Sequence, residues 1–359
     1  MPIVKADRRL RVGIVGLGQI ARAAHLDACA KARNVELAAV CDVAADLVDA
    51  AHRAWNPKAA YHGYDAMLAD PLVEAVIVAT ADQFHVPLTL RALVAGKHVL
   101  LEKPMGVTVE ECESLRAAVE ASDSVVQIGH MKRFDPGIAY AREFARAEIG
   151  DILAVRAWYC DSVYRYTMTD NLQPIPIGSA ASARPDADPR SDRQRYLLMT
   201  HGCHLIDTAR YLGGEIVAVR GRHQHRADAH CWFIETELAN GALGHLELTV
   251  PVRGDFEEGF RVYGSEGSIV GRVYLPWFHK SSEVECFSTR DRVYRRPLGE
   301  DAHTYKLQLE GFADTILDGG PQVGANVEDG IANTRALVAI ARSCAGGEWV
   351  RLDAVTGGV

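Results

Sequence analysis

The feature that most constrains the fold is a glycine turn between an expected strand and an expected helix near the start of the chain. The segment "RVGIVGLG" (11–18) has the apolar run of a buried strand that leads into the turn, and a helix is expected directly after it, over 21–32. Gly16, Gly18 and Ala21 form the pattern GxGxxA. The first glycine permits a tight turn, the second lets the backbone approach a pyrophosphate, and the small alanine lets the helix pack on the strand. The turn therefore predicts a dinucleotide site.

The same alternation of strand and helix continues to the end of the first third of the chain. Further strands are expected at 35–42, 73–80, 97–104 and 124–129, with helical patterns between them. Their near-continuous Val, Ile and Leu content is typical of a parallel sheet covered by helices on both faces. We therefore expect a Rossmann dinucleotide-binding domain over residues 1–129.

The second part of the chain has a different pattern of apolar runs. After about residue 130 the strand-like runs are longer and are joined by turns, and Asn240-Gly241 between two apolar runs is a strong hairpin signal. We expect residues 130–359 to form an α/β domain built on a large, mostly antiparallel open sheet. The segment 171–194 is rich in Pro, Ser and Asp without periodicity, which favours a lid over a site.

Composition excludes several classes of partner. The chain holds 39 Lys and Arg against 47 Asp and Glu, a formal net charge of −8, and has no long basic stripe, so nucleic acid and anionic membranes are not expected partners. No apolar run is long enough to span a bilayer, and the N-terminus lacks the pattern of a signal peptide. Eight scattered cysteines without a CxxC pair indicate reduced thiols. We expect a cytoplasmic enzyme or binding protein.

The second strand points to the identity of the dinucleotide. It ends in Asp42, about 20 residues after the glycine turn, where a carboxylate accepts hydrogen bonds from ribose hydroxyls and repels a 2′-phosphate. Val43 follows instead of an arginine, so NAD is expected rather than NADP. Gln19 and Ile20 complete the loop expected against the cofactor. The alternative is a glycine turn that binds no nucleotide.

A second constellation lies in "THGCHLIDTARYLGG" (200–214). His201, His204 and Asp207 recur every third residue, which places them on one face of a helix. The face could bind a metal, move a proton or lie in a core. Helical histidine pairs in zinc enzymes are usually four residues apart, which argues against the metal. The alternative is that both histidines lie in the core or cap a helix and have no chemical role.

Four motifs resemble the glucose–fructose oxidoreductase, inositol dehydrogenase and rhizopine-catabolism (Gfo/Idh/MocA) family. Ala81 and Asp82 stand where that family usually has Pro and Asn. The resemblance covers nearly the whole chain and implies a Rossmann domain followed by an α/β domain whose open sheet carries the active site and often oligomer contacts. The motifs are "LLEKP" (100–104), "GHMKRFDPG" (129–137), "VATADQFH" (78–85) and "VYGSEGSIV" (262–270).

The resemblance implies roles for the residues around the EKP motif. Lys103 would contact substrate and take part in catalysis, and partial desolvation beside a cationic nicotinamide would lower its pKa. Glu102 would orient the lysine or the nicotinamide ribose. Thr80 and Ala81 are expected to line the cofactor, and His85 to anchor the loop beneath it.

The resemblance also interprets the histidine face. Related sugar and cyclitol dehydrogenases carry D-x-x-x-H-x-x-D, in which the first Asp and the His pair with the lysine around the reacting hydroxyl. His204 and Asp207 match the last two positions, but Thr200 replaces the first Asp and cannot serve as a charged partner for the imidazole. His204 is thus the expected catalytic base, and Asp207 the structural member. His201 and Thr200 are expected to contact substrate.

Three further residues are candidate substrate ligands. Lys132 follows the last strand of the first domain, where it could lie near the nicotinamide or bind substrate oxygens. Asp161 and Tyr164 fall where related inositol dehydrogenases place polar substrate-binding residues. Each could equally be a solvated surface residue.

The sequence as a whole predicts an NAD-dependent oxidoreductase that interconverts a ring hydroxyl of a sugar, sugar derivative or cyclitol with its ketone. No catalytic metal is expected, and the resemblance implies a homodimer or homotetramer. Two alternatives stay open. One is redox-neutral, NAD-assisted glycoside cleavage, since Thr200-His201-Gly202 resembles a motif of the family's glycosidases. The other is a non-enzymatic, NAD-dependent regulator of a sugar pathway.

Overall fold

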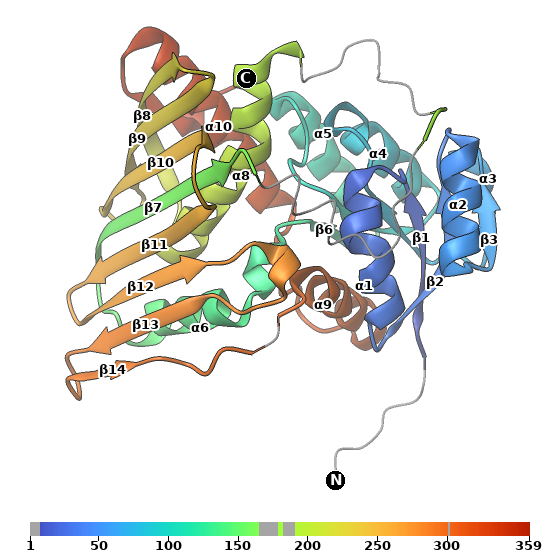
Figure 1. Cartoon of the computed structure of the whole chain (residues 1–359), viewed down its shortest axis with the longest axis horizontal. Helices are drawn as coiled ribbons and strands as arrows, with labels where there is room; N and C mark the ends of the chain where they lie inside the picture. The colour runs from blue at the N-terminus through green and yellow to red at the C-terminus, as the bar shows by residue number, and fades with distance from the viewer. Residues whose placement is uncertain (1–7, 165–178, 182–190, 301) are drawn as a thin grey trace.

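The computed structural model describes residues 8–164, 179–181, 191–300 and 302–359, which form two sheets side by side (Figure 1). The first is a six-stranded parallel sheet in the order β3-β2-β1-β4-β5-β6, as the alternating pattern predicts. Its strands are β1 (Leu10–Val15), β2 (Val35–Cys41), β3 (Ala59–Tyr61), β4 (Ala75–Val78), β5 (His98–Leu101) and β6 (Val126–Ile128).

Helices cover both faces of this sheet because its strands are apolar on both sides. One face packs against α1 (Leu26–Lys31), α2 (Ala45–Trp55) and α9 (Thr304–Asp318). The other face packs against α3 (Tyr64–Ala69), α4 (His85–Val94) and α5 (Val109–Glu120). A short π-helix, Ala21–His25, precedes α1, so the helix expected over 21–32 opens with a wider turn.

The second sheet has nine strands in the order β14-β13-β12-β11-β7-β10-β9-β8-β15. Among its neighbouring strands only β10 and β7 run parallel, so the expectation of a mostly antiparallel sheet is confirmed. The strands are β7 (Ile152–Ser162), β8 (Ile216–Arg226), β9 (Ala229–Leu238), β10 (Leu243–Val252), β11 (Glu257–Gly264), β12 (Gly267–Val273), β13 (Glu283–Ser288), β14 (Val293–Arg295) and β15 (Val350–Arg351).

Helices α6 (Pro136–Ala147), α8 (Arg193–Gly213) and α10 (Val327–Gly346) pack on one face of the second sheet. The hairpin expected at Asn240-Gly241 joins β9 to β10, and Gly241 has a φ of 85°, a value that glycine adopts without strain. Among the described residues, no helix combines the length and the apolar content needed to cross a membrane.

Two segments that follow residue 130 contact the first domain. Helix α9 comes from the C-terminal part of the chain yet places Tyr305, Leu309 and Phe312 in the core of the first sheet. Most of the segment expected as a lid, 171–194, lies outside the described residues, and α8 already begins at Arg193. Within it, Ser179–Ala181 donate three hydrogen bonds to Asp46 in the first turn of α2.

Candidate active site

The glycine turn has the shape that a pyrophosphate requires. Gly16 has a φ of 88°, and a Cβ there would lie 2.6 Å from the carbonyl oxygen of Ala79, so no larger residue fits. A Cβ on Gly18 would meet nothing within 4 Å, which leaves open space in front of the helix. Gln19 is exposed and Ile20 half-buried at the start of that helix. The observed turn therefore fits NAD.

Asp42 lies directly after β2 and holds the turn in place. One carboxylate oxygen accepts the Leu17 N–H at 2.6 Å and the other accepts the Ala44 N–H at 2.8 Å. Each oxygen retains a further lone pair, which can accept a hydrogen bond from a ribose hydroxyl of NAD. The neighbouring Val43 is almost fully exposed and offers no positive charge to a 2′-phosphate.

The loop after β4 is joined to the EKP motif by one imidazole. His85 places its Nδ1 2.7 Å from the carbonyl oxygen of Pro104 and its Nε2 3.2 Å from that of Thr80. This arrangement supports the expected anchoring role of His85. The hydroxyl oxygen of Thr80 is buried and has no hydrogen-bond partner among the described residues, so it can serve a cofactor at this loop, which continues into Ala81.

Lys103 reaches from the first domain to α8. Its Nζ donates to the main-chain carbonyl of Thr200 at 3.3 Å. Burial acts to lower the pKa of Lys103, but the acidic groups around it, first Cys203 and then Glu102 and Asp82, raise that pKa above its ordinary value. With only the side chains of the protein around it, Lys103 therefore does not have the lowered pKa that was expected.

Glu102 is fixed by a residue that the sequence did not single out. Its Oε1 lies 2.8 Å from Nε2 of His25, whose side chain is 1% exposed, and its Oε2 accepts the N–H of Lys103 at 3.2 Å. Burial acts to raise the pKa of Glu102, but the His25 contact and the Lys103 charge hold it below its ordinary value. The carboxylate is thus charged, and it connects the π-helix that precedes α1 to the EKP motif.

The three polar residues of the α8 face have different partners. His201 Nδ1 lies 3.5 Å from Asp161, and Asp207 accepts two hydrogen bonds from Nε of Arg133 and one from its Nη2. His204 instead stacks on the ring of Tyr159, with centroids 5.9 Å apart and planes 5° apart. The three side chains have separate partners. This arrangement is expected when each residue has its own role, and not when all three bind one metal ion. Asp207 therefore has the contacts of a structural residue.

His204 is buried beside two positive charges. Burial first, and then the charges of Lys132 and Lys103, lower its pKa well below the ordinary value for histidine. The imidazole is consequently neutral near pH 7, and a neutral imidazole can accept a proton.

Lys132 lies in the same cluster and is paired with Glu258, another residue that the sequence did not reveal. The ammonium of Lys132 donates to Oε1 of Glu258 and lies 4.6 Å from the centroid of the Tyr159 ring. Burial lowers the pKa of Lys132 and raises that of Glu258, against the attraction between them. Of the two lysines in this cluster, Lys132 is thus the one whose pKa is lowered, whereas that of Lys103 is raised.

Two expected substrate ligands are placed differently from the rest. Tyr164, just beyond β7, is 63% exposed, and the structure does not place it in the cluster. The hydroxyl of Thr200 donates to the carbonyl of Tyr196 one turn earlier in α8, at 2.7 Å, so Thr200 meets Lys103 through its main chain.

A group of metal-type ligands lies away from this cluster, at Asp27, His279 and His303. Nδ1 of His303 accepts the N–H of Lys306 at 3.3 Å, and its Nε2 lies 2.8 Å from Asp27, which also accepts from Lys31. With Nδ1 used as an acceptor, Nε2 carries the proton and has no lone pair for a metal. Hydrogen bonding therefore accounts for Asp27 and His303, and the His279 ring stacks on that of His303.

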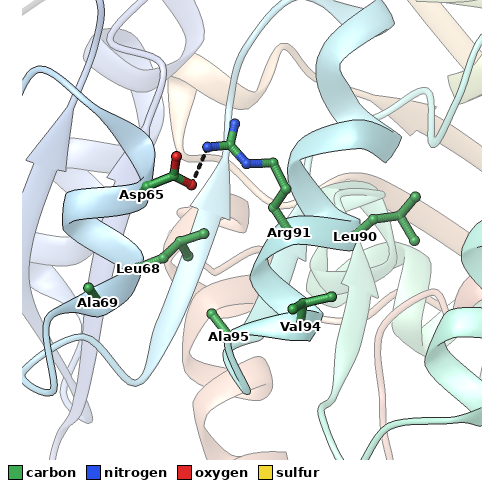
Figure 2. A pocket seen from close by; sticks show the side chains of 7 residues that line it. All are labelled: Asp65, Leu68, Ala69, Leu90, Arg91, Val94 and Ala95. Carbon is green, nitrogen blue, oxygen red and sulfur yellow. Dashed lines mark hydrogen bonds and ion pairs between the residues drawn. The ribbon is translucent and has the colours of Figure 1, made fainter.

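Figure 2 shows an apolar groove between α3 and α4, on the outside of the first domain. Arg91 on one wall is paired with Asp65 on the other, and Leu68, Leu90 and Val94 supply the apolar surface. None of the expected site residues lines it. The candidate active site is instead the cluster around Lys103 and His204.

Comparison with known proteins agrees with this geometry. Residues 10–130 match the GFO_IDH_MocA model, described as an oxidoreductase family with an NAD-binding Rossmann fold, and residues 194–352 match its C-terminal alpha/beta domain. The chain is 25% identical to inositol 2-dehydrogenase of Rubrobacter xylanophilus over 336 residues, 91% of this chain and 88% of that protein. It is 26% identical to 1,5-anhydro-D-fructose reductase of Ensifer adhaerens over 299 residues, 80% of this chain and 83% of that protein.

Solved structures share the whole architecture. A levoglucosan dehydrogenase, solved in complex with NADH and L-sorbose, superimposes with a TM-score of 0.78 at 23% identity, over 96% of this chain and 99% of that one. At that identity the likeness establishes the fold, namely a Rossmann domain followed by a domain on an open sheet.

Proposed function

The chain belongs to the Gfo/Idh/MocA family of NAD-binding oxidoreductases, and from that premise we propose that it interconverts a ring hydroxyl and a ketone of a sugar, sugar derivative or cyclitol. Relatives named inositol 2-dehydrogenase and 1,5-anhydro-D-fructose reductase support this substrate class. NAD, when bound, takes up or returns the hydride at C4 of its nicotinamide. The turn at Gly16 and Gly18 would hold its pyrophosphate, and Asp42 its adenine ribose.

Lys103 and His204 divide the handling of the hydroxyl proton. His204 is neutral because burial and the neighbouring lysines lower its pKa, so it can take the proton from the hydroxyl as the hydride leaves. Lys103 keeps its charge because the surrounding acidic groups raise its pKa, and an ammonium stabilises the developing alkoxide. In the reverse direction the same two groups polarise the ketone and return the proton.

The observation that carries the proposal is the bond between Lys103 Nζ and the Thr200 carbonyl at 3.3 Å. It brings the lysine of the cofactor domain to the helix of the substrate domain that bears His204, one turn further along. Holding both groups against one substrate carbon lowers the barrier by positioning as well as by charge. His201, paired with Asp161, would bind a neighbouring substrate oxygen.

The test is a panel of sugars, polyols and cyclitols assayed for NADH formation with the purified chain, followed by Lys103→Ala on the best substrate. We expect kcat to fall by at least about a hundredfold while NAD still binds, since removal of a proton-handling group costs 10²–10⁴ in rate. Full turnover by Lys103→Ala would overturn the role of Lys103. Cleavage of a glycoside without net NADH would favour the redox-neutral reaction, and NAD binding without any turnover would favour a regulator.

A further inference from the structure

Glu258 is placed in the active site by the pairing of two strands. In the ladder between β11 and β7, Glu258 lies opposite Tyr159, so both side chains are on the sheet face that α8 covers. Glu258 is 3% exposed, whereas its neighbour Glu257 is exposed on the opposite face. The two adjacent glutamates of one strand therefore have different surroundings.

One oxygen of Glu258 is satisfied and the other is not. Oε1 accepts from the Lys132 ammonium, while Oε2 is buried and has no hydrogen-bond partner among the residues that the structure describes. A buried carboxylate oxygen without a partner is costly, and such groups in folded proteins call for an explanation. Through Lys132 and Tyr159 this oxygen belongs to the cluster that contains His204.

Helix α8 carries no carboxylate next to Lys103, since its Asp207 pairs with Arg133. Thr200 occupies the position at which the motif would have aspartate, and its hydroxyl is bonded to Tyr196 within α8. A ring with several hydroxyls needs an acceptor as well as donors, and a lysine supplies donors only. Glu258 is the buried carboxylate that β11 brings to Lys132.

We propose that Glu258 and Lys132 together bind the hydroxyl next to the carbon that is oxidised, so that the substrate is a neutral vicinal diol. This inference rests on the proposed function and narrows its substrate class. Oε2 of Glu258 accepts the hydrogen of that hydroxyl, and the Lys132 ammonium donates to its oxygen. A sugar acid with a carboxylate at this position would be repelled by Glu258.

The test uses the polyol that turns over fastest among myo-inositol, D-glucose and D-xylose, together with its analogue that lacks the hydroxyl next to the reacting carbon. We expect the wild-type protein to prefer the parent polyol by roughly a hundredfold or more in kcat/KM, because the deoxy analogue leaves buried polar groups unpaired. In Glu258→Gln the preference should fall to within about tenfold, mainly through loss on the parent compound. Glu257→Gln, on the other face of the strand, is the matched control and should keep the wild-type ratio.

A purely structural role for Glu258 would lower Tm and would reduce kcat/KM for both compounds equally, and that result would overturn the inference. If Glu258→Gln does not fold, the double variant Lys132→Met/Glu258→Leu removes both charges together and should fold, with the same loss of preference. An unchanged preference in the double variant would also overturn the inference. Absence of turnover with every polyol in the panel would instead overturn the proposed function.

Discussion

The ammonium of Lys103 donates to the main-chain carbonyl of Thr200, 3.3 Å away, and so joins the loop after β5 to helix α8 of the C-terminal domain. The contact is made by the threonine backbone, which any residue at this position would supply. The threonine hydroxyl is bonded to Tyr196 instead.

Thr200→Val should therefore be nearly silent. Valine keeps the shape of threonine and the carbonyl that Lys103 needs, and the lost bond to Tyr196 is worth only about 1 kcal/mol. We expect kcat/KM on the best substrate to stay within about threefold of wild type, measured by NADH formation. A loss of a hundredfold would show that the hydroxyl itself contacts the substrate.

His25→Ala should lower kcat more than it weakens NAD binding. His25 holds one oxygen of Glu102, and without it the carboxylate can turn away from Lys103. We expect kcat to fall by about 10- to 100-fold, the range for loss of an orienting partner, with the Kd for NADH changed much less. His25→Gln can restore the hydrogen bond and should recover part of the rate.

The matched control for His25 is His52→Ala, on the exposed side of α2. It should leave both kcat and the Kd for NADH unchanged. Equal loss of kcat and NADH affinity in His25→Ala would mean that His25 supports the cofactor site as a whole and does not position Glu102.

Asp207→Ala should destabilise the protein. It would leave the Arg133 guanidinium buried without the carboxylate that takes three of its hydrogen bonds, and breaking a buried pair costs about 3–5 kcal/mol. Urea unfolding should show this loss, while kcat of the protein that remains folded should stay near wild type. Asp353→Ala, at an exposed pair with Arg351, serves as the control with little effect. Normal stability combined with lost turnover would make Asp207 a catalytic group.

His130 should make the protein less stable in mild acid. Burial first, and then the nearby Arg133 and Arg210, lower its pKa to about 4 against the attraction of Asp207. The unfolded chain takes up a proton near pH 6.5 while the native protein does not, so this stability is complete above pH 6.5 and is lost as pH falls toward 4. Between pH 7 and 5.5 the loss from His130 should be roughly 1 kcal/mol in urea unfolding. His130→Gln should show a smaller loss over that interval, and an equal loss would exclude His130 as its source.

Local patterns predicted much of the fold. The apolar runs gave the parallel sheet, the glycine at position 16 gave the turn with its positive φ, and Asn240-Gly241 gave the hairpin. Each of these signals can be recognised in a short stretch of sequence. The candidate site could be predicted where a motif carries it, at Lys103, His204 and Asp42.

The remaining site residues could not be predicted from the sequence, because contacts between distant segments bring them into the site. Glu258 meets Lys132 across 126 positions and His25 meets Glu102 across 77, and no spacing in the sequence marks either pair. The direction of the Lys103 pKa was also unpredictable, since it depends on Cys203 and Asp82, which reach the lysine from other segments.

Helix α9 has a consequence for how the molecule folds. Tyr305, Leu309 and Phe312 fill the core of the first sheet, although they follow that sheet by about half the length of the chain. A fragment that stopped at Gly129 would expose the apolar surface of α1 and β1 that α9 covers. The core of the first sheet is therefore completed only by α9, a helix that lies after most of the C-terminal domain in the chain. Unfolding of the two halves should accordingly be cooperative.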